Sequence, residues 1–261
     1  AWPPLNLYPD PTADVLRDAI AATYGVERTN LLMTNGSDEL IDLLVRSFVR
    51  PGRKIVGLSP SYGMYRVAAE SNGRFFSDVP LRSDCSADED ALFAALDGAD
   101  LLFLCSPNNP TGTILPAPLL RRILAEFSGL VVVDEAYGEF ADAEGISSAI
   151  ESMKRGAGNL LVMRTFSKAF AGAGIRLGYG IADAAVIDVL MRMKAPYNVN
   201  VLTQAAGLAL WKRRDVMKRN VRSVISERER IARECKRLGC IVFPSRANFL
   251  LLQLPEGVTA Q

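Results

Sequence analysis

The chain has 261 residues, of which 49% are apolar and 23% charged, so it can bury a large core and has the composition of an ordinary globular protein. Its net charge is +1 and its acidic and basic residues are mixed, so no basic block indicates a nucleic acid or an anionic membrane as a partner. The complete lack of histidine excludes histidine-ligated zinc hydrolases and triads that use a histidine base. Acid–base chemistry must therefore use lysine, carboxylate, tyrosine or a bound cofactor.

Neither export nor membrane insertion is predicted. The first residues lack the charged and apolar regions of a signal peptide, and the longest apolar runs are far too short to span a bilayer. Cys85, Cys105, Cys235 and Cys240 show no CxxC spacing, so we expect buried free thiols in a reducing cytoplasm, with a disulfide as the less favoured alternative.

Short apolar runs alternate with amphipathic stretches through the first three quarters of the chain. Residues 37–49 have apolar side chains at helical spacing, and Ser37 and Asp38 are the expected helix caps. Strands are expected at residues 53–60, 74–81, 99–107, 129–137 and 158–167, and helices between them at 63–73, 88–98 and 116–129. This alternation predicts an α/β fold with a mostly parallel sheet buried on both faces.

The pattern changes after residue 200. Residues 201–238 are expected to form one long helix, followed by a strand pair at 240–245 and 248–254. We therefore expect two domains. Residues 1–200 would form a large three-layer α/β/α domain with an N-terminal arm, and 201–261 a connecting helix and the start of a small α+β domain.

Unusual polar residues follow the expected strands, at the edge where open α/β sheets bind ligands. Gly36 and Ser37 stand at a helix start, where free N–H groups attract an anion, although taken alone an ordinary capped helix is the favoured explanation. In the stretch "SPNNPTG" (residues 106–112) the asparagine amides could donate to a ligand oxygen, or the stretch is only a turn.

Asp134 directly follows the β-branched run "VVV". An ionised carboxylate in that position is partly buried, which is unfavourable unless a cation accompanies it. A structural salt bridge or a helix cap is the alternative explanation. Tyr137, three residues later, could donate a hydrogen bond in the same direction.

Lys168 is the only lysine in "RTFSKAFAGAGIRLGYG" (residues 164–180), and Phe166 and Phe170 are expected to wall it in. The usual role of a lysine is a solvated surface charge, but this setting favours an amine kept for chemistry. The glycines of "GAGIRLG" (residues 172–178) lack the spacing and context of a dinucleotide-binding turn. They let the chain pass close to the lysine, and Arg176 offers two donors to a phosphate.

Together these residues predict a site for a phosphorylated aldehyde with a basic ring nitrogen. The helix start and Arg176 suit its phosphate, Asp134 its protonated nitrogen, and Lys168 its carbonyl carbon. Pyridoxal 5′-phosphate is such a molecule.

The order of the motifs resembles the fold-type I pyridoxal-phosphate aminotransferases, and within them the histidinol-phosphate aminotransferases. The resemblance covers essentially the whole chain. The matching stretches are "YPDP…LRDAIA", "NGSDELI", "PSYGMY", "CSPNNPTG", "VVVDEAYGEF", "RTFSKAFAGAGIRLGYG" and "SRANFLLL".

The resemblance implies a role for each residue. Lys168 would form a Schiff base with the cofactor and then move the substrate proton, Asp134 would pair with the ring nitrogen, and Tyr62 would stack on the ring. Tyr137 and Asn109 would hydrogen-bond the ring hydroxyl oxygen. The phosphate would be bound by Gly36, Ser37, Asp38, Ser167 and Arg176, and by Tyr8 from the other subunit of a homodimer.

The implied reaction is amino transfer between histidinol phosphate and 2-oxoglutarate in histidine biosynthesis. Threonine-phosphate decarboxylase and aromatic aminotransferase chemistry on the same fold are alternatives, as is a cofactor-binding remnant without turnover. The family's substrate-gripping arginine would lie beyond Gln261 and its N-terminal substrate segment before Ala1.

Overall fold

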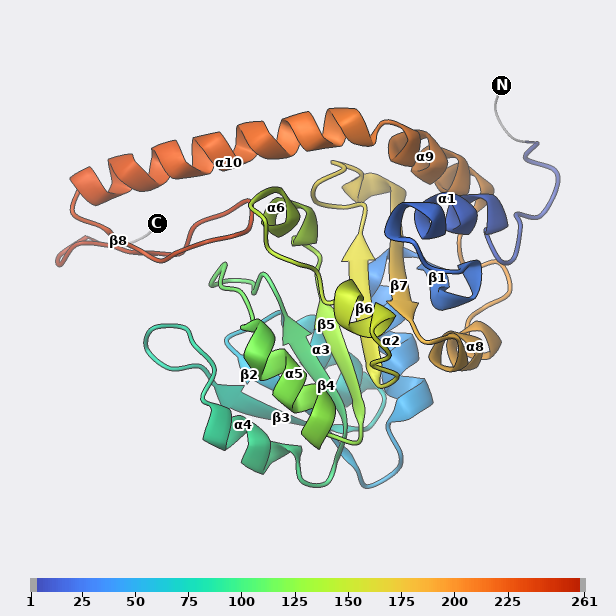
Figure 1. Cartoon of the computed structure of the whole chain (residues 1–261), viewed down its shortest axis with the longest axis horizontal. Coiled ribbons are helices and arrows are strands. Elements are labelled where there is room, and N and C mark those ends of the chain that lie inside the picture. Colours follow the sequence, from blue (N-terminus) through green and yellow to red (C-terminus); the bar gives the residue numbers. More distant parts are fainter. Residues whose placement is uncertain (1–3, 259–261) are drawn as a thin grey trace.

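The computed structural model describes residues 4–258, which are built around one seven-stranded sheet of order β1-β7-β6-β5-β4-β2-β3 (Figure 1). Its strands are β1 (Leu31–Thr34), β2 (Lys54–Ser59), β3 (Phe75–Pro80), β4 (Ala99–Cys105), β5 (Leu130–Asp134), β6 (Leu160–Thr165) and β7 (Gly178–Ala182). The five strands expected from the apolar runs are all present. The parallel pairs β2–β3, β2–β4, β4–β5 and β5–β6 confirm a mostly parallel sheet.

Strand β7 runs antiparallel to both of its neighbours, β1 and β6, and the sequence analysis did not predict it. Its sequence, "GYGIA", contains two glycines and therefore gives a weak strand signal. Gly178 is required for packing, because a Cβ there would lie 2.7 Å from the backbone nitrogen of Ser37. The glycine lets the start of the next helix approach the sheet.

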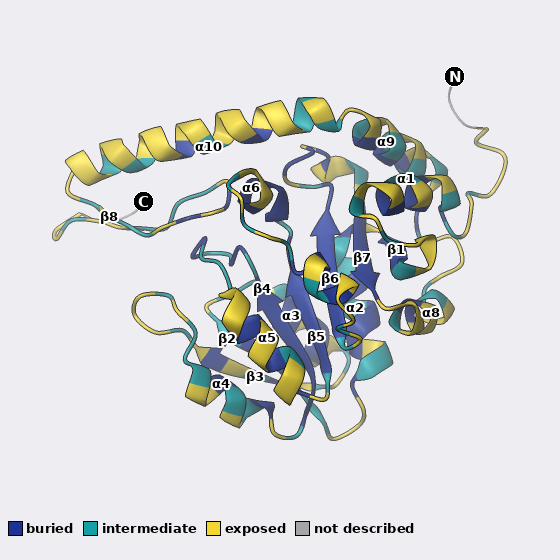
Figure 2. Ribbon diagram, viewed as in Figure 1, coloured by how far each residue is buried: buried dark blue, intermediate teal, exposed yellow. Residues whose placement is uncertain are grey.

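Helices cover both faces of the sheet, which confirms the three-layer architecture. One face carries α2 (Gly36–Phe48), α3 (Met64–Ser71) and α8 (Ala184–Met193), and the other α1 (Asp14–Tyr24), α4 (Glu89–Leu96), α5 (Ala117–Glu126), α7 (Ile150–Lys154) and α9 (Val201–Lys212). Alternate strand residues serve the two faces: Val131 and Val133 of β5 join one apolar cluster and Val132 the other. Figure 2 shows the strands buried between the helices.

Two expectations about helix boundaries were wrong. Ser37 and Asp38 do not cap α2 but lie inside its first turn; Asn35 precedes the helix, without a side-chain cap. The predicted helix 201–238 is two helices, α9 and α10 (Arg214–Arg237), divided at Arg213. The division follows from packing: Trp211 at the end of α9 is buried in the core, whereas α10 is largely exposed (Figure 2).

Helix α10 spans the molecule above α6 (Gly138–Ala143), and the short pair β8 (Ile241–Val242) and β9 (Leu252–Gln253) lies beneath its far end (Figure 1). Buried Arg228 ties these parts together, since it binds the Glu144 carboxylate at 3.0 Å and the carbonyl of Ala247 at 3.0 Å. The division into domains at residue 200 stays a prediction.

The cysteines are free, and Cys105 is buried while the other three are half-buried. Within residues 4–258, no helix combines the length and the apolar content needed to cross a bilayer.

Candidate active site

A cavity of about 160 Å³ opens at the carboxyl ends of β4, β5 and β6, next to the start of α2. Nine of the eleven residues predicted from the sequence line it: Ser37, Asp38, Tyr62, Asn109, Asp134, Tyr137, Ser167, Lys168 and Arg176. Cys105, Ala136, Thr165 and Ala173 complete the lining. Residues from five separate stretches of the chain therefore meet at the carboxyl edge of the sheet, which is the place that the sequence predicted.

One end of the cavity is suited to an anion. The first backbone N–H groups of α2 have no side-chain cap, and the guanidinium of Arg176 lies beside them. Arg176 forms an ion pair with Asp38 at 3.2 Å, and the Tyr62 hydroxyl donates to the same carboxylate at 3.0 Å. Asp38 thus fixes two cavity side chains with its carboxylate, while its backbone belongs to the helix start.

Gly36 does not line the cavity, but its backbone permits this arrangement. Its φ is +76°, and a Cβ there would lie 2.6 Å from Nη2 of Arg176. Only glycine adopts this φ without steric strain, and only glycine leaves room for the guanidinium.

Gly36→Ala should weaken pyridoxal phosphate binding about tenfold, because left-handed backbone is unfavourable by about 1–2 kcal/mol for alanine and Arg176 must also move. Gly52→Ala is the matched control, since Gly52 has φ +77° but open space around its Cβ position. Equilibrium dialysis with the cofactor should show a loss for Gly36→Ala alone. Equal losses for both variants would show that only general strain was measured.

The other end of the cavity holds Asp134, which is 3% exposed. Its Oδ2 accepts a hydrogen bond from the Tyr65 hydroxyl at 2.7 Å and its Oδ1 from the backbone N–H of Ala136 at 2.9 Å. Burial nevertheless raises the pKa of Asp134 to about 6. No basic side chain pairs with it in the described part of the chain, so the salt-bridge alternative does not hold there and a cationic group in the cavity would compensate its charge.

Tyr65 is a site residue that the sequence analysis missed. It is 1% exposed, and its ring stacks on Phe103 with centroids 4.6 Å apart, which fixes the hydroxyl on Asp134. Its position three residues after Tyr62 in "SYGMY" is the only signal that the sequence offered.

Tyr65→Phe should raise the pKa of Asp134 further, because the ionised carboxylate loses a hydrogen bond of about 1.5–3 kcal/mol. We expect the acidic limb of the pH–kcat profile to move up by about one unit or more, since one unit corresponds to 1.36 kcal/mol. Tyr179→Phe is the matched control: it removes an equally buried hydroxyl that contacts Tyr24 instead. A lower rate with an unchanged pH profile would contradict this role of Tyr65.

Lys168 lies in the turn after β6, with its Nζ 5.3 Å from the centroid of the Tyr137 ring. The expectation that Phe166 and Phe170 wall it in was wrong. Their rings lie 4.7 Å apart in the core and pack on Trp211, and Lys168 itself is exposed. The two apolar rings pack in the core, whereas Lys168 lines the cavity. Strand β6 ends at Thr165 and the chain turns over residues 166–170, so the alternation of an extended strand does not apply to these three side chains.

The residues present fit pyridoxal phosphate. The cavity joins an exposed primary amine, a buried carboxylate that lacks a cation, and an anion-binding helix start with an arginine. Tyr62, which lines the cavity, supplies an aromatic surface. Tyr8 is not part of this cavity: it is 81% exposed and stacks on Tyr197, with ring centroids 4.6 Å apart.

Comparison with known proteins agrees with this geometry. The family described as aminotransferase class I and II matches residues 2–261. The chain belongs to this family. Histidinol-phosphate aminotransferase of Pyrococcus furiosus is 41% identical over 249 residues, which are 95% of this chain and 70% of that protein.

Two solved structures relate the fold to specific members of the family. Histidinol-phosphate aminotransferase of Sinorhizobium meliloti in complex with pyridoxal-5′-phosphate aligns with a TM-score of 0.88 at 28% identity, covering 95% of this chain and 68% of that chain. L-threonine-O-3-phosphate decarboxylase of Porphyromonas gingivalis aligns with a TM-score of 0.82 at 26% identity, covering 97% and 75%.

The expected fold, the transaminase class and pyridoxal phosphate as cofactor are therefore confirmed. Amino donors and keto acids are the substrates that this aminotransferase family implies. The roles of the individual side chains stay predictions.

Proposed function

We propose that this aminotransferase transfers the amino group of histidinol phosphate to 2-oxoglutarate, acting as a cytoplasmic homodimer in histidine biosynthesis. The observation that carries the proposal is the single cavity shared by Lys168, Asp134 and the Arg176–α2 anion site. The 41% identity to a histidinol-phosphate aminotransferase supports the choice of substrate.

Each residue has a defined task in this mechanism. The bound cofactor supplies an electron sink for the charge that develops at the substrate Cα. Asp134, held by Tyr65 and Ala136, keeps the ring nitrogen protonated. Arg176, Ser37 and Ser167 hold the phosphate, and Tyr62 covers the ring.

Lys168 has two tasks. Its Nζ holds the cofactor before the substrate arrives, and once released it removes the proton at the substrate Cα as a general base. The Lys168 amine lies over the ring of Tyr137, and Asn109 lines the same cavity. Tyr137 and Asn109 are suited to hydrogen-bond the ring oxygen.

The test adds histidinol phosphate to the pyridoxal-phosphate-loaded chain without any keto acid. The visible absorbance should change to that of the pyridoxamine form, and 2-oxoglutarate should restore it. If the cofactor binds but histidinol phosphate leaves the absorbance unchanged, the proposed substrate is wrong.

The structural likeness to L-threonine-O-3-phosphate decarboxylase favours one second candidate, decarboxylation of a phosphorylated amino acid. Release of carbon dioxide from threonine phosphate distinguishes it, because amino transfer releases none. Conversion of the cofactor to the pyridoxamine form by an aromatic amino acid, but not by histidinol phosphate, would instead indicate an aromatic aminotransferase. Cofactor binding without turnover of any donor would indicate the remnant.

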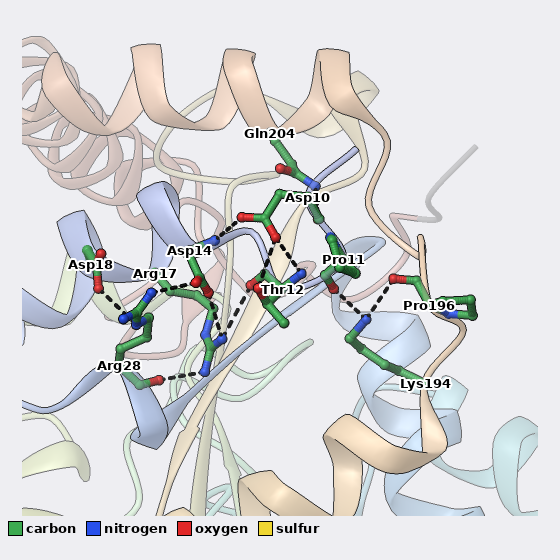
Figure 3. A network of polar contacts seen from close by, with 10 residues as sticks. All are labelled: Asp10, Pro11, Thr12, Asp14, Arg17, Asp18, Arg28, Lys194, Pro196 and Gln204. Carbon is green, nitrogen blue, oxygen red and sulfur yellow. Dashed lines mark hydrogen bonds and ion pairs between the residues drawn. The ribbon is translucent and has the colours of Figure 1, made fainter. Parts of the chain in front are cut away.

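The N-terminal segment supports the proposed dimer. Figure 3 shows how it is fixed before α1: Asp10 accepts from the N–H groups of Thr12 and Asp14, and Lys194 and Gln204 donate to the carbonyls of Pro11 and Asp10 at 2.7 and 2.8 Å. The segment before this anchor exposes apolar side chains: Leu5, Leu7 and Tyr8 are 61–81% exposed. Tyr8 is thereby presented outward, where a second subunit would meet it.

Sedimentation should give a dimer, and Tyr8→Ala should weaken retention of the cofactor phosphate while leaving the fold intact. Tyr197→Ala, which removes the stacking partner of Tyr8, serves as the comparison. A monomer that retains the cofactor equally well with and without Tyr8 would refute the shared site.

A further inference from the structure

A second cavity, of about 480 Å³, lies between the end of α1, helix α6 and the first turns of α10. None of its lining residues belongs to the cavity of Lys168. Tyr24, Phe170, Trp211, Met217 and Val221 give it an apolar and largely aromatic wall. Its volume is within the range of about 300–1,000 Å³ that is typical of small-molecule sites.

The inner side of this cavity is acidic and incompletely paired. Glu139 is 7% exposed, and neither of its carboxylate oxygens has a hydrogen-bond partner among residues 4–258. Arg164 is 3.5 Å away, but it already binds Glu135 at 2.6 Å and Asp142 at 2.8 Å. Three carboxylates thus surround one guanidinium, and the hydrogen-bonding capacity of the Glu139 carboxylate is left unused.

Burial also raises the pKa of Glu139 to about 7, which agrees with a carboxylate that lacks compensation. Two phenols lie near it, but the hydroxyls of Tyr24 and Tyr179 hydrogen-bond each other at 2.9 Å, and neither hydrogen-bonds Glu139.

The outer side of the cavity is basic. Arg214, Lys218 and Arg222 lie four residues apart and therefore on one face of α10. None of the three has an acidic partner in the described chain, whereas Arg219 and Arg228 on the same helix form ion pairs. Like charges at this spacing destabilise a helix, so an anion at this rim would be stabilising.

We propose that this cavity binds a free α-amino acid with an apolar side chain. Its ammonium group would bind Glu139, its carboxylate Lys218 and Arg222, and its side chain the aromatic wall. A simple anion would be repelled by Glu139 and Asp142, and a simple amine would leave the basic rim unpaired. Phe170 follows Lys168 by two residues, so the ligand would contact the catalytic turn from its core side.

The probes are L-phenylalanine, 2-phenylethylamine, which lacks the carboxylate, and 3-phenylpropionate, which lacks the ammonium group. Their binding to the cofactor-loaded enzyme is measured by titration calorimetry while the visible absorbance reports on the active site. We expect L-phenylalanine to bind without an absorbance change, and each analogue to bind at least about tenfold more weakly.

Two variants remove the opposite sides of the site. Glu139→Gln removes the inner charge, and the double variant Lys218→Met with Arg222→Met removes the exposed rim without touching the core. Each should weaken L-phenylalanine binding about tenfold or more. Arg233→Met is the matched control, because Arg233 is exposed on α10 and does not line the cavity.

Several results would overturn the proposal. These are no calorimetric binding of L-phenylalanine, equally tight binding of either analogue, or binding that survives both sets of substitutions. Binding that appears only together with a change of the cofactor absorbance would place the amino acid in the active site. The rim variant keeps the test valid if Glu139→Gln fails to fold.

Discussion

Replacing Lys168 with alanine should abolish the visible absorbance of covalently held pyridoxal phosphate and slow the conversion of histidinol phosphate by about 10²–10⁴-fold, the contribution typical of a general acid–base group. The cause is the loss of the amine that both holds the cofactor and removes the substrate proton. Lys168 is exposed, so the substitution should leave the free energy of unfolding nearly unchanged.

Lys236→Ala is the control for this prediction, because Lys236 is exposed near the end of α10 and far along the chain from the cavity. It should retain both the absorbance and the rate. Single-turnover absorbance measurements on the two variants provide the comparison. A Lys168→Ala protein that keeps the wild-type absorbance would show that another amine holds the cofactor.

Asp134→Asn should reduce kcat by about 10²–10³-fold, the effect typical of removing one preorganised electrostatic group from an active site. Without the carboxylate, the ring nitrogen loses the partner that keeps it protonated. Asp188→Asn, which removes an exposed carboxylate on α8, should leave kcat unchanged. An Asp134→Asn protein with wild-type kcat would refute the assigned role.

Although it lowers kcat, Asp134→Asn should stabilise the cofactor-free protein. The pKa of Asp134 is raised from 3.8 to about 6, so the folded state binds more protons than the unfolded state between these values. The contribution of Asp134 to the free energy of unfolding is therefore present below pH 3.8 and lost as the pH rises through 6.

Asparagine does not titrate, so cofactor-free Asp134→Asn should gain about 3 kcal/mol relative to the wild type between pH 3.8 and pH 7. Denaturant unfolding of both proteins at several pH values measures this difference. A difference that stays constant with pH would show that the carboxylate has an ordinary pKa. The ionised Asp134 carboxylate would thus destabilise the cofactor-free protein and yet be needed for kcat. This combination is expected where a buried carboxylate is compensated only by a bound cation.

Much of this site could be predicted because its residues follow strongly apolar strands. The run "VVV" before Asp134 identified the strand, and strand ends in an open sheet define the ligand edge. Tyr65 could not be predicted in the same way. Its hydroxyl reaches Asp134 only because its ring stacks on Phe103, a contact across 38 positions that no local pattern contains.

The errors have a common origin in tertiary packing. The division between α9 and α10 depends on where Trp211 is buried. The orientation of Phe166 and Phe170 depends on the same indole ring, because both of their rings pack against it. The hydrogen bonds of Arg164 with Glu135 and Asp142 also join residues distant in sequence, and the Glu139 carboxylate beside them has no hydrogen bond in the described chain. Local periodicity determines the elements, but not which of their side chains meet.

Borohydride reduction of the pyridoxal-phosphate-loaded chain, followed by peptide mapping of the added mass, tests directly whether Lys168 holds the cofactor. We expect a single phosphopyridoxyl group on the Nζ of Lys168, in the peptide that follows β6. A stable adduct on another lysine, or none on the folded protein, would contradict this expectation.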